Sequence, residues 1–584
     1  MRCLRLGYPG WVLFFFDETP PDRFIKPSQR DTASLWRPNT GLIALLIAVA
    51  PCASSSQADA QTIWSNGFES GRPCPWSEIF TRETCDGRDN DCDRRIDGES
   101  CINGTTCALP AEVANLNGAH VVGDGTPESC TEAALNAAIA DAGAAAITFD
   151  CGATPHTIVV TSEKAISRDL VIDGGGLITL SGGGTTRILK LDSYFDRDYP
   201  LLTLQFLNLV DGYTADLPGT ETSSGGAAVF RLGGSLTILD CIFENNVGPS
   251  PGQDVAGGAV YSLGIGTTVI SGSIFLNNRC SSGGAIGNLH NHLELVNSIV
   301  RGSSATGNGG NPGNGGNGGG VYMDGINQTF NICGSVISGN TANALGGGVF
   351  RVSNNGIGPM TIDQTTIAGN VVNDAPSLSQ AGGLYLQGLQ TVMTGSTVSG
   401  NTANSSGGLF VWENPGTQTL DMTNVTIANN HTRASLGAGM SVNQNVTGTL
   451  WQVTIAGNST AGATSFASAI NGGHSLVLKN TLIADNTKVF IWENTSCNQL
   501  HTGQGANYQW PNLNAGGQAE QACAGNTVFA DPLLLSLGDN GGPTETILPT
   551  TGSPAIGTAT GCPATDQRGQ PRNPASCTPG ATEP

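Results

Sequence analysis

A ninefold repeat with a period of about 30 residues constrains the fold of this chain more than any other feature. Between Gly225 and Asn486, each repeat has a Gly-rich opening, a short apolar run and a strand that ends in Asn or, once, Ser. The polar end positions are Asn246, Asn278, Ser303, Asn340, Asn370, Asn401, Asn430, Asn458 and Asn486. Strand composition at this period is typical of a β-solenoid, in which each repeat forms one coil.

An apolar residue stands three positions before each of these polar residues. The set is Phe243, Phe275, Val300, Ile337, Ile367, Val398, Ile427, Ile455 and Ile483. In a parallel β-helix, equivalent residues stack about 4.8 Å apart, so an inward position must be apolar in every coil. The sequence therefore predicts an all-β fold, a right-handed single-stranded parallel β-helix of about eleven to thirteen coils. The alternative, a disordered Gly-rich array, does not explain nine aligned apolar positions.

The corner residues of the repeat predict how the coils are joined. Asn tolerates the left-handed backbone conformation, and its side-chain amide can bond to the Asn of the next coil. We expect both properties at the repeated Asn. Residues 307–316, which are almost entirely Gly and Asn, are expected to form a flexible loop at one corner.

The repeat divides the chain into parts. Residues 116–496 are expected to form the β-helix, and residues 131–142 are expected to form an amphipathic helix that covers its open N-terminal end. After Asn486 the repeat decays, so residues 497–584 are expected to be an irregular, Cys-containing terminal part. Residues 61–115 form a Cys- and Asp-rich segment that precedes the solenoid.

Residues 1–60 are interpreted as an export signal with a misassigned start. The apolar run 42–50 is followed by small residues and by Ala58-Asp59-Ala60, which predicts cleavage before Gln61. Residues 1–34 lack export character, so we expect translation to begin near Leu35. The run is too short to span a bilayer, and no transmembrane segment is expected in the mature chain. Lipidation of Cys52 is an alternative, but Pro51 departs from the usual motif. These features predict a secreted or cell-surface protein.

Composition is consistent with export and excludes some partners. The net charge of −21 argues against nucleic acid and anionic membrane surfaces. The 16 Cys residues suit an oxidising compartment. Local spacing favours the pairs Cys130–Cys151, Cys497–Cys523 and Cys562–Cys577. Three further residues, Cys241, Cys280 and Cys333, are interpreted as small buried hydrophobic side chains.

Two sets of motifs resemble known bacterial families. Gly257-Gly258-Ala259-Val260 and Phe243-Glu244-Asn245-Asn246 resemble the repeats of polymorphic outer-membrane proteins. Residues 537–557, 566–569 and 580–583 resemble the choice-of-anchor Q domain of bacterial surface proteins. This resemblance implies a right-handed β-helix over residues 117–583 and a location at the surface of a bacterium. Gly557 departs from the family pattern, and no apolar tail follows, so secretion without a covalent anchor is expected.

An acidic loop before the repeat is the sharpest candidate for a metal site. Its carboxylates, Asp89, Asp91, Asp93 and Asp97, alternate along a turn next to Cys85 and Cys92. Alternating carboxylates in a turning loop can converge on one hard cation, so Ca²⁺ is the expected ligand. The segment resembles a short metal-binding motif of secreted bacterial proteins, from which Arg94 departs. The alternative is a solvated acidic turn stapled by the two cysteines.

The sequence favours an adhesive or structural protein without catalysis, and assigns no catalytic or cofactor-binding residues. Its expected partner is an extracellular glycan or a surface or matrix protein. The alternative is a carbohydrate-active enzyme, a polysaccharide lyase or hydrolase, that acts along the β-helix flank. Asp363 and Asp421 are expected to share one strand face, as hydrolysis would require. Three tryptophans, Trp412, Trp451 and Trp492, are candidates for stacking on sugars.

Overall fold

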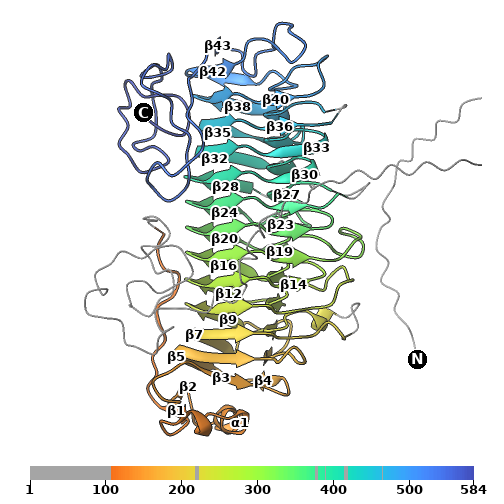
Figure 1. Ribbon diagram of the computed structural model, residues 1–584, viewed down its shortest axis with the longest axis vertical. Coiled ribbons are helices and arrows are strands. Elements are labelled where there is room, and N and C mark those ends of the chain that lie inside the picture. The colour runs from red at the N-terminus through yellow and green to blue at the C-terminus, as the bar shows by residue number, and fades with distance from the viewer. Residues whose placement is uncertain (1–106, 218–221, 375–378, 389, 414–417, 463–464) are drawn as a thin grey trace, which may run out of the picture. The chain divides into compact units, whose positions relative to one another are not determined.

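The computed structural model describes residues 107–217, 222–374, 379–388, 390–413, 418–462 and 465–584. Strands account for 44% of these described residues and helices for 3%, and the strands wind into a β-solenoid of about 13 turns (Figure 1). All strand pairs between named strands are parallel, and they form three sheets of 24, 11 and 8 strands, which we call sheets A, B and C. The predicted all-β parallel β-helix is confirmed.

The strands of sheet A are β1 (Ala119–Val122), β2 (Ala146–Phe149), β3 (His156–Val159), β5 (Leu170–Ser181), β7 (Leu201–Val210), β9 (Ser235–Leu239), β10 (Ile242–Glu244), β12 (Thr267–Ser271), β13 (Ile274–Leu276), β16 (His292–Val296), β17 (Ile299–Arg301), β20 (Phe330–Cys333), β21 (Val336–Ser338), β24 (Met360–Asp363), β25 (Thr366–Ala368), β28 (Gln390–Thr394), β29 (Thr397–Ser399), β32 (Thr419–Ala428), β35 (Thr447–Ala456), β38 (Ser475–Lys479), β39 (Leu482–Ala484), β41 (Thr502–Gln504), β42 (Asn507–Trp510) and β43 (Thr527–Phe529).

The strands of sheet B are β4 (Lys164–Ile166), β6 (Leu189–Asp192), β8 (Val229–Leu232), β11 (Val260–Leu263), β15 (Ile286–Leu289), β19 (Val321–Asp324), β23 (Val349–Val352), β27 (Leu384–Gln387), β31 (Leu409–Trp412), β34 (Met440–Val442) and β37 (Ile470–Gly472). The strands of sheet C are β14 (Arg279–Cys280), β18 (Ser304–Ala305), β22 (Thr341–Ala342), β26 (Val371–Val372), β30 (Thr402–Ser405), β33 (His431–Ser435), β36 (Ser459–Thr460) and β40 (Thr487–Lys488). A coil therefore runs from sheet B through sheet A to sheet C.

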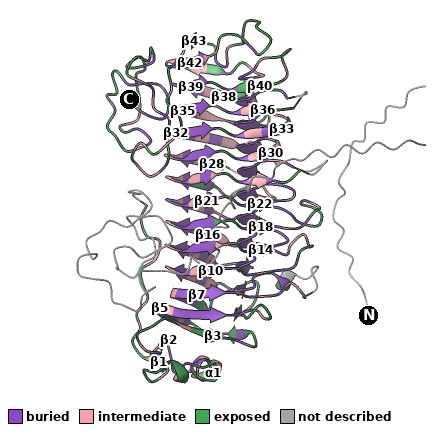
Figure 2. Ribbon diagram, in the orientation of Figure 1, coloured by how far each residue is buried: buried purple, intermediate pink, exposed green. Residues whose placement is uncertain are grey.

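The predicted apolar residues form one inward column. Phe243 pairs with Phe275, Phe275 with Val300, and the register continues coil by coil to Ile483. Each of the nine is at most 1% exposed. The rings of Phe243 and Phe275 stack with their centroids 4.6 Å apart. Figure 2 shows the resulting burial along the strands, with exposed residues concentrated in the connecting segments.

The polar residue that follows this column forms a buried hydrogen-bonded ladder. Asn370 donates its backbone N–H and its side-chain amide to Oδ1 of Asn401, at 2.9 and 3.0 Å. The same amide group also donates to the carbonyl of Ile337 in the preceding coil, at 2.9 Å. The expected bond between stacked Asn residues is confirmed. The left-handed residue, however, is the one before it, such as Gly369 or Asn429. The ladder Asn itself does not adopt the left-handed conformation. Its side chain and its backbone N–H both point along the solenoid axis.

Chain segments cover the N-terminal end of the solenoid and, near its C-terminal end, the outer face of sheet A (Figure 1). Helix α1 (Glu132–Ala140) begins after Thr131, which accepts a hydrogen bond from the Ala134 N–H, and it buries Leu135 and Ala138 against the N-terminal coils. This confirms the predicted capping helix. The 3₁₀ helices η1 (Pro127–Ser129) and η2 (Thr222–Ser224) lie in connecting segments. At the other end, the C-terminal segment runs beside the strands of sheet A (Figure 1).

The C-terminal segment is attached to sheet A by polar side chains. The Gln567 amide donates to the Ser396 carbonyl at 3.2 Å and to Thr397 Oγ1 at 2.8 Å, and its carbonyl oxygen accepts from Thr426 Oγ1 at 2.7 Å. Parallel pairing also continues beyond residue 496, through β41, β42 and β43. The terminal part thus adds strands to the solenoid before it folds back along it.

The structure contains the three disulfides that spacing favoured, Cys130–Cys151, Cys497–Cys523 and Cys562–Cys577. Cys241 and Cys280 are buried free thiols, as predicted. The prediction for Cys333 was wrong, because Cys333 forms a disulfide with Cys107. Cys333 ends a strand at an outward-facing bend of sheet A, where the segment that precedes the solenoid passes. In the described part of the chain, no helix is long and apolar enough to cross a membrane.

Candidate functional site

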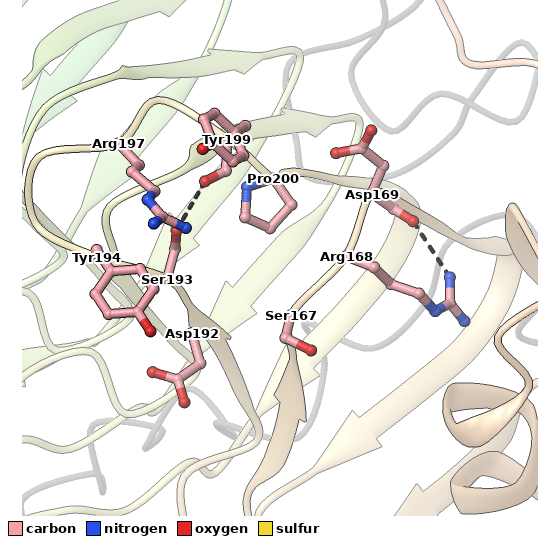
Figure 3. A pocket seen from close by; sticks show the side chains of 9 residues that line it. All are labelled: Ser167, Arg168, Asp169, Asp192, Ser193, Tyr194, Arg197, Tyr199 and Pro200. Atoms are coloured by element: carbon pink, nitrogen blue, oxygen red, sulfur yellow. Dashed lines mark hydrogen bonds between the residues drawn. The ribbon is translucent and has the colours of Figure 1, made fainter.

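A cavity of about 790 Å³ lies on the N-terminal coils, where the chain turns from sheet B into sheet A (Figure 3). Two consecutive turns line it, the turn between β4 and β5 and the longer one between β6 and β7. The lining residues are Ser167, Arg168, Asp169, Asp192, Ser193, Tyr194, Arg197, Tyr199 and Pro200. Aromatic and charged side chains from two stacked turns therefore face one space.

The loop 193–200 is an insertion that the backbone holds in place. It contains eight residues, whereas the stacked turn 167–169 has three. Ser193 Oγ donates to the Tyr199 carbonyl at 2.7 Å, and the Arg197 N–H donates to the Tyr194 carbonyl at 3.0 Å. The Gly234 N–H of the next coil donates to the Arg197 carbonyl at 2.7 Å. These bonds fix the loop without using the Tyr194, Arg197 or Tyr199 side chains.

Glycine in the next coil makes this close approach possible. Gly233 has φ +60°, and a Cβ atom there would lie 1.8 Å from the Tyr194 carbonyl oxygen. Any larger residue would push the loop away from the solenoid, so the Gly233-Gly234 turn is required by the pocket above it.

Arg197 lies between the two tyrosines of the loop (Figure 3). Its guanidinium carbon is 4.3 Å from the centroid of the Tyr194 ring and 5.5 Å from that of Tyr199. Both tyrosines remain exposed, at 62% and 59%. Each ring therefore offers its remaining surface to solvent, and the cation–π contacts favour this arrangement of the three side chains.

The other charged groups of the pocket already have partners. The Arg168 guanidinium donates to backbone carbonyls, including those of Ala144 at 2.6 Å and Asp141 at 2.9 Å. Asp169 Oδ1 accepts from the Leu201 N–H at 2.8 Å, and Asp192 Oδ1 lies 3.3 Å from Lys190 Nζ. Within the described chain, neither carboxylate uses its second oxygen. The pocket thus combines free carboxylate oxygens with a stacked cation.

The surface continues along the turns between sheets B and A. The Phe195 carbonyl accepts from the Ile265 N–H at 2.9 Å, and its ring meets His290 edge-on with centroids 5.6 Å apart. Further along, Ile326 and Ile357 are exposed on equivalent turns. Because successive coils are about 4.8 Å apart, these side chains form a row parallel to the solenoid axis.

A second cluster of polar groups lies on the outer side of sheet B. Asp324 is 6% exposed and ends β19. Its Oδ2 accepts from Asn311 Nδ2 at 2.6 Å and from the Tyr322 hydroxyl at 3.2 Å, and its Oδ1 accepts from Asn354 Nδ2 at 2.8 Å and the Gly325 N–H at 2.6 Å. Through Asn311, Asp324 ties the Gly-rich loop 307–316 to the sheet, so this expected loop is anchored at its centre.

Asp254 completes this cluster. Burial raises the pKa of Asp254, the charge of Asp324 raises it further, and the neighbouring Tyr322 hydroxyl and the charge of His290 oppose these effects. Two carboxylates with different environments therefore lie together beside a histidine. The sequence alone does not bring Asp254 and Asp324 together, because the two residues are 70 positions apart.

The sequence-predicted tryptophans do not form one site. Trp412 is 43% exposed and stacks on Phe410 in sheet B, with centroids 5.6 Å apart. Trp451 lies in sheet A under Lys479 Nζ, which is 4.2 Å from the centroid of its ring. Trp492 is 70% exposed and follows the sheet C strand β40. They lie on sheet B, on sheet A and in the turn that follows sheet C, so they do not provide one continuous platform.

The predicted carboxylates are also apart. Asp363 accepts from Thr394 Oγ1 at 2.5 Å, and Asp421 accepts from the Thr449 N–H at 3.0 Å. β24 and β32 are separated by β28, so the two acids lie on the same face but two coils apart. Each carboxylate accepts a hydrogen bond from the next strand, and the two do not form one catalytic site.

The expected Ca²⁺ ligands Asp89, Asp91, Asp93 and Asp97 and the expected export signal lie outside the described residues. Among the described residues, no group of three or more His, Cys, Asp or Glu side chains could hold a metal ion. No protein-family model matches the chain, and no curated protein matches it. The resemblance to the choice-of-anchor Q domain therefore stays a prediction.

Sequence reasoning missed the pocket itself. The signal available was the segment Tyr-Phe-Asp-Arg-Asp-Tyr-Pro at 194–200, which places three aromatic and three charged residues between two strands. This segment occurs once, outside the ninefold repeat, so the periodicity of the sequence does not predict a role for it. Only the structure shows that Arg197 stacks between Tyr194 and Tyr199 instead of pairing with an acid.

Proposed function

We propose that this protein is an exported, extracellular β-helix protein that binds a glycan without transforming it, as an adhesive or structural component of a bacterial surface. The observation that carries the proposal is the pocket in which Tyr194 and Tyr199 stay exposed on either side of Arg197. Ligand sites typically combine aromatic surface with a few placed polar groups. Sugar rings suit such sites because their C–H faces pack on aromatic rings while their hydroxyls bond to carboxylates.

Two further features support this proposal. Four disulfides among the described residues fit an oxidising, extracellular compartment. The row of exposed side chains from Phe195 to Ile357 gives an extended polymer a path along the solenoid. A rigid scaffold with a preformed site also lowers the entropic cost of binding.

A glycan array probed with the full-length protein tests the proposal. We expect binding to a subset of polysaccharides, and loss of about tenfold or more in affinity when Tyr194 and Tyr199 are both changed to Ala. Trp492→Ala is the matched control, because it removes an equally exposed aromatic ring at the other end of the solenoid and should leave binding unchanged. Failure of the protein to bind any glycan, or equal binding by the double variant, would refute the proposal.

A carbohydrate-active enzyme is the second candidate, and the Asp254–Asp324 cluster favours it. The raised pKa of Asp254 suits a general acid, and Asp324 provides a second carboxyl group beside it, as hydrolysis would require. Against catalysis, all four bonds to Asp324 come from groups that hold local loops in place.

Product release from a polysaccharide panel separates the two candidates. If the protein is an enzyme, the wild type releases reducing ends or unsaturated products, and Asp254→Asn abolishes the release while glycan binding persists. Binding without any release of product, in the wild type as in the variant, is the result that the adhesive proposal predicts.

A further inference from the structure

We infer that the pocket recognises a sugar ring that carries a single carboxylate, a uronic acid residue, through the guanidinium of Arg197. This inference rests on the proposed function and names the chemical class of the glycan. The starting observation is that the Arg197 guanidinium has π-contacts with Tyr194 and Tyr199 but, among the described residues, no hydrogen bond or ion pair.

The stacking orients Arg197 for an anion. Rings that pack against a guanidinium contact its faces and leave the N–H groups in its plane free. A planar fork of N–H donors matches a carboxylate, which it can bind through two parallel hydrogen bonds. The two tyrosines and the hydrogen-bonded loop backbone restrict the guanidinium group before a ligand binds. Less side-chain entropy is therefore lost on binding.

The protein does not supply the missing anion. Asp196 and Asp198 flank Arg197 in the loop, but among the described residues neither forms an ion pair with it. Asp192, at the end of β6, is paired with Lys190, and Asp169 is bonded to the backbone of Leu201. Arg168 is occupied by backbone carbonyls. Among the described residues, no acceptor therefore occupies the Arg197 guanidinium, which is exposed and open to a ligand.

The acids in the same pocket restrict the ligand to one negative charge. The free oxygens of Asp169 and Asp192 can accept hydrogen bonds from sugar hydroxyls, but they would repel a second anionic group nearby. The net charge of −21 similarly opposes a densely charged polymer. A uronic acid within an otherwise neutral glycan satisfies Arg197 and both aspartates at once.

Calorimetry with the full-length protein tests this inference. The probes are a disaccharide of glucuronic acid and glucose, its neutral glucose–glucose analogue, and a glucose disaccharide bearing a sulfate ester. We expect the uronate to bind more tightly than the other two. Arg197→Gln should lower its affinity by about tenfold or more, and Arg197→Lys by a smaller factor, because Lys keeps the charge but loses the fork. Arg301→Gln, at another exposed arginine, is the control.

The outcomes separate the inference from the function on which it rests. Equal binding of the uronate and neutral sugars, or unchanged uronate affinity in Arg197→Gln, would overturn the role of Arg197 while leaving glycan binding intact. Preference for the sulfate ester would overturn the assignment to a carboxylate. If no saccharide binds, including on the array, both proposals fail. Arg197 is exposed, so circular dichroism and thermal unfolding should show that the variants keep the wild-type fold.

Discussion

Asn401 donates both its backbone N–H and its side-chain amide to Oδ1 of Asn430, each at 3.0 Å. The pair is one step of a buried ladder that links the corner of each coil to the next. Strand pairing holds the backbones together, whereas this ladder fixes the position of the corner at which the chain leaves sheet A for sheet C.

Replacing Asn401 with Ala should therefore destabilise the solenoid. The change leaves the backbone N–H of Asn370 and one N–H of its side-chain amide without their acceptor, and it removes the amide that donates to the Ile367 carbonyl, all in a buried site. We expect a loss of about 2–5 kcal/mol in the free energy of unfolding, measured by urea denaturation. Asn401→Ser should cost less, because Ser303 serves the same ladder through its hydroxyl. An equal loss from Asn373→Ala, at an exposed Asn pair, would contradict this account.

Replacing Ile427 with Asp tests the inward column. Ile427 is fully buried between Val398 and Ile455, so the new carboxylate would have no partner. We expect a cost of about 4 kcal/mol or more, or failure to fold. Thr361→Asp, on an exposed outward position of β24, is the control and should change the melting temperature little. A neutral effect of Ile427→Asp would show that the column does not face the core.

Removing the Cys107–Cys333 disulfide should loosen the segment that precedes the solenoid. The bond joins residues 226 positions apart, and typical losses on removing such a link are about 2–5 kcal/mol. In the Cys107→Ser/Cys333→Ser variant, limited proteolysis should cut residues 107–118 faster than in the wild type. The Cys562→Ser/Cys577→Ser variant should not change cleavage there. Identical cleavage in all three proteins would show that the disulfide does not hold this segment.

The raised pKa of Asp254 predicts how stability depends on pH. Because its folded-state pKa lies above the ordinary 3.8, the folded state favours the protonated form. The stabilisation of the folded state by protonated Asp254 is fully present below pH 3.8. It is lost as pH rises through the folded-state pKa. Asp254→Asn should therefore raise the melting temperature at neutral pH and lose this advantage near pH 3.

Melting temperatures measured across pH 3–8 check this prediction, with Asp196→Asn, a change at an exposed aspartate, as the control. The groups that face Asp254 are Asp324, Tyr322 and His290. If the melting temperature of Asp254→Asn changed with pH in parallel with that of the wild type, ionised Asp254 would not destabilise the fold.

The fold could be predicted because its determinants repeat. The column from Phe243 to Ile483 occurs once per coil, so nine copies report the same inward position. The left-handed corner was misplaced by one residue because Asn and Gly both suit that conformation. Only the observed φ angles of residues such as Gly369 show that it precedes the ladder.

The candidate site could not be predicted because its determinants do not repeat. The pocket depends on one insertion, on a stacked turn of the preceding coil, and on Gly233 in the following coil. Cys107 and Cys333 similarly meet only because the chain before the solenoid runs back along sheet A. Neither the pocket nor this disulfide has a characteristic local spacing in the sequence from which it could be predicted. The Ca²⁺ loop at Asp89, Asp91, Asp93 and Asp97 stays a sequence-based prediction.

The most direct measurement is a crystal structure of the protein with a bound glucuronate-containing oligosaccharide. The account predicts that the carboxylate accepts two hydrogen bonds from Arg197, with a sugar face on Tyr194 or Tyr199 and hydroxyls bonded to Asp169 or Asp192. A ligand bound elsewhere, such as at Trp492, with the Arg197 pocket containing only solvent, would contradict it.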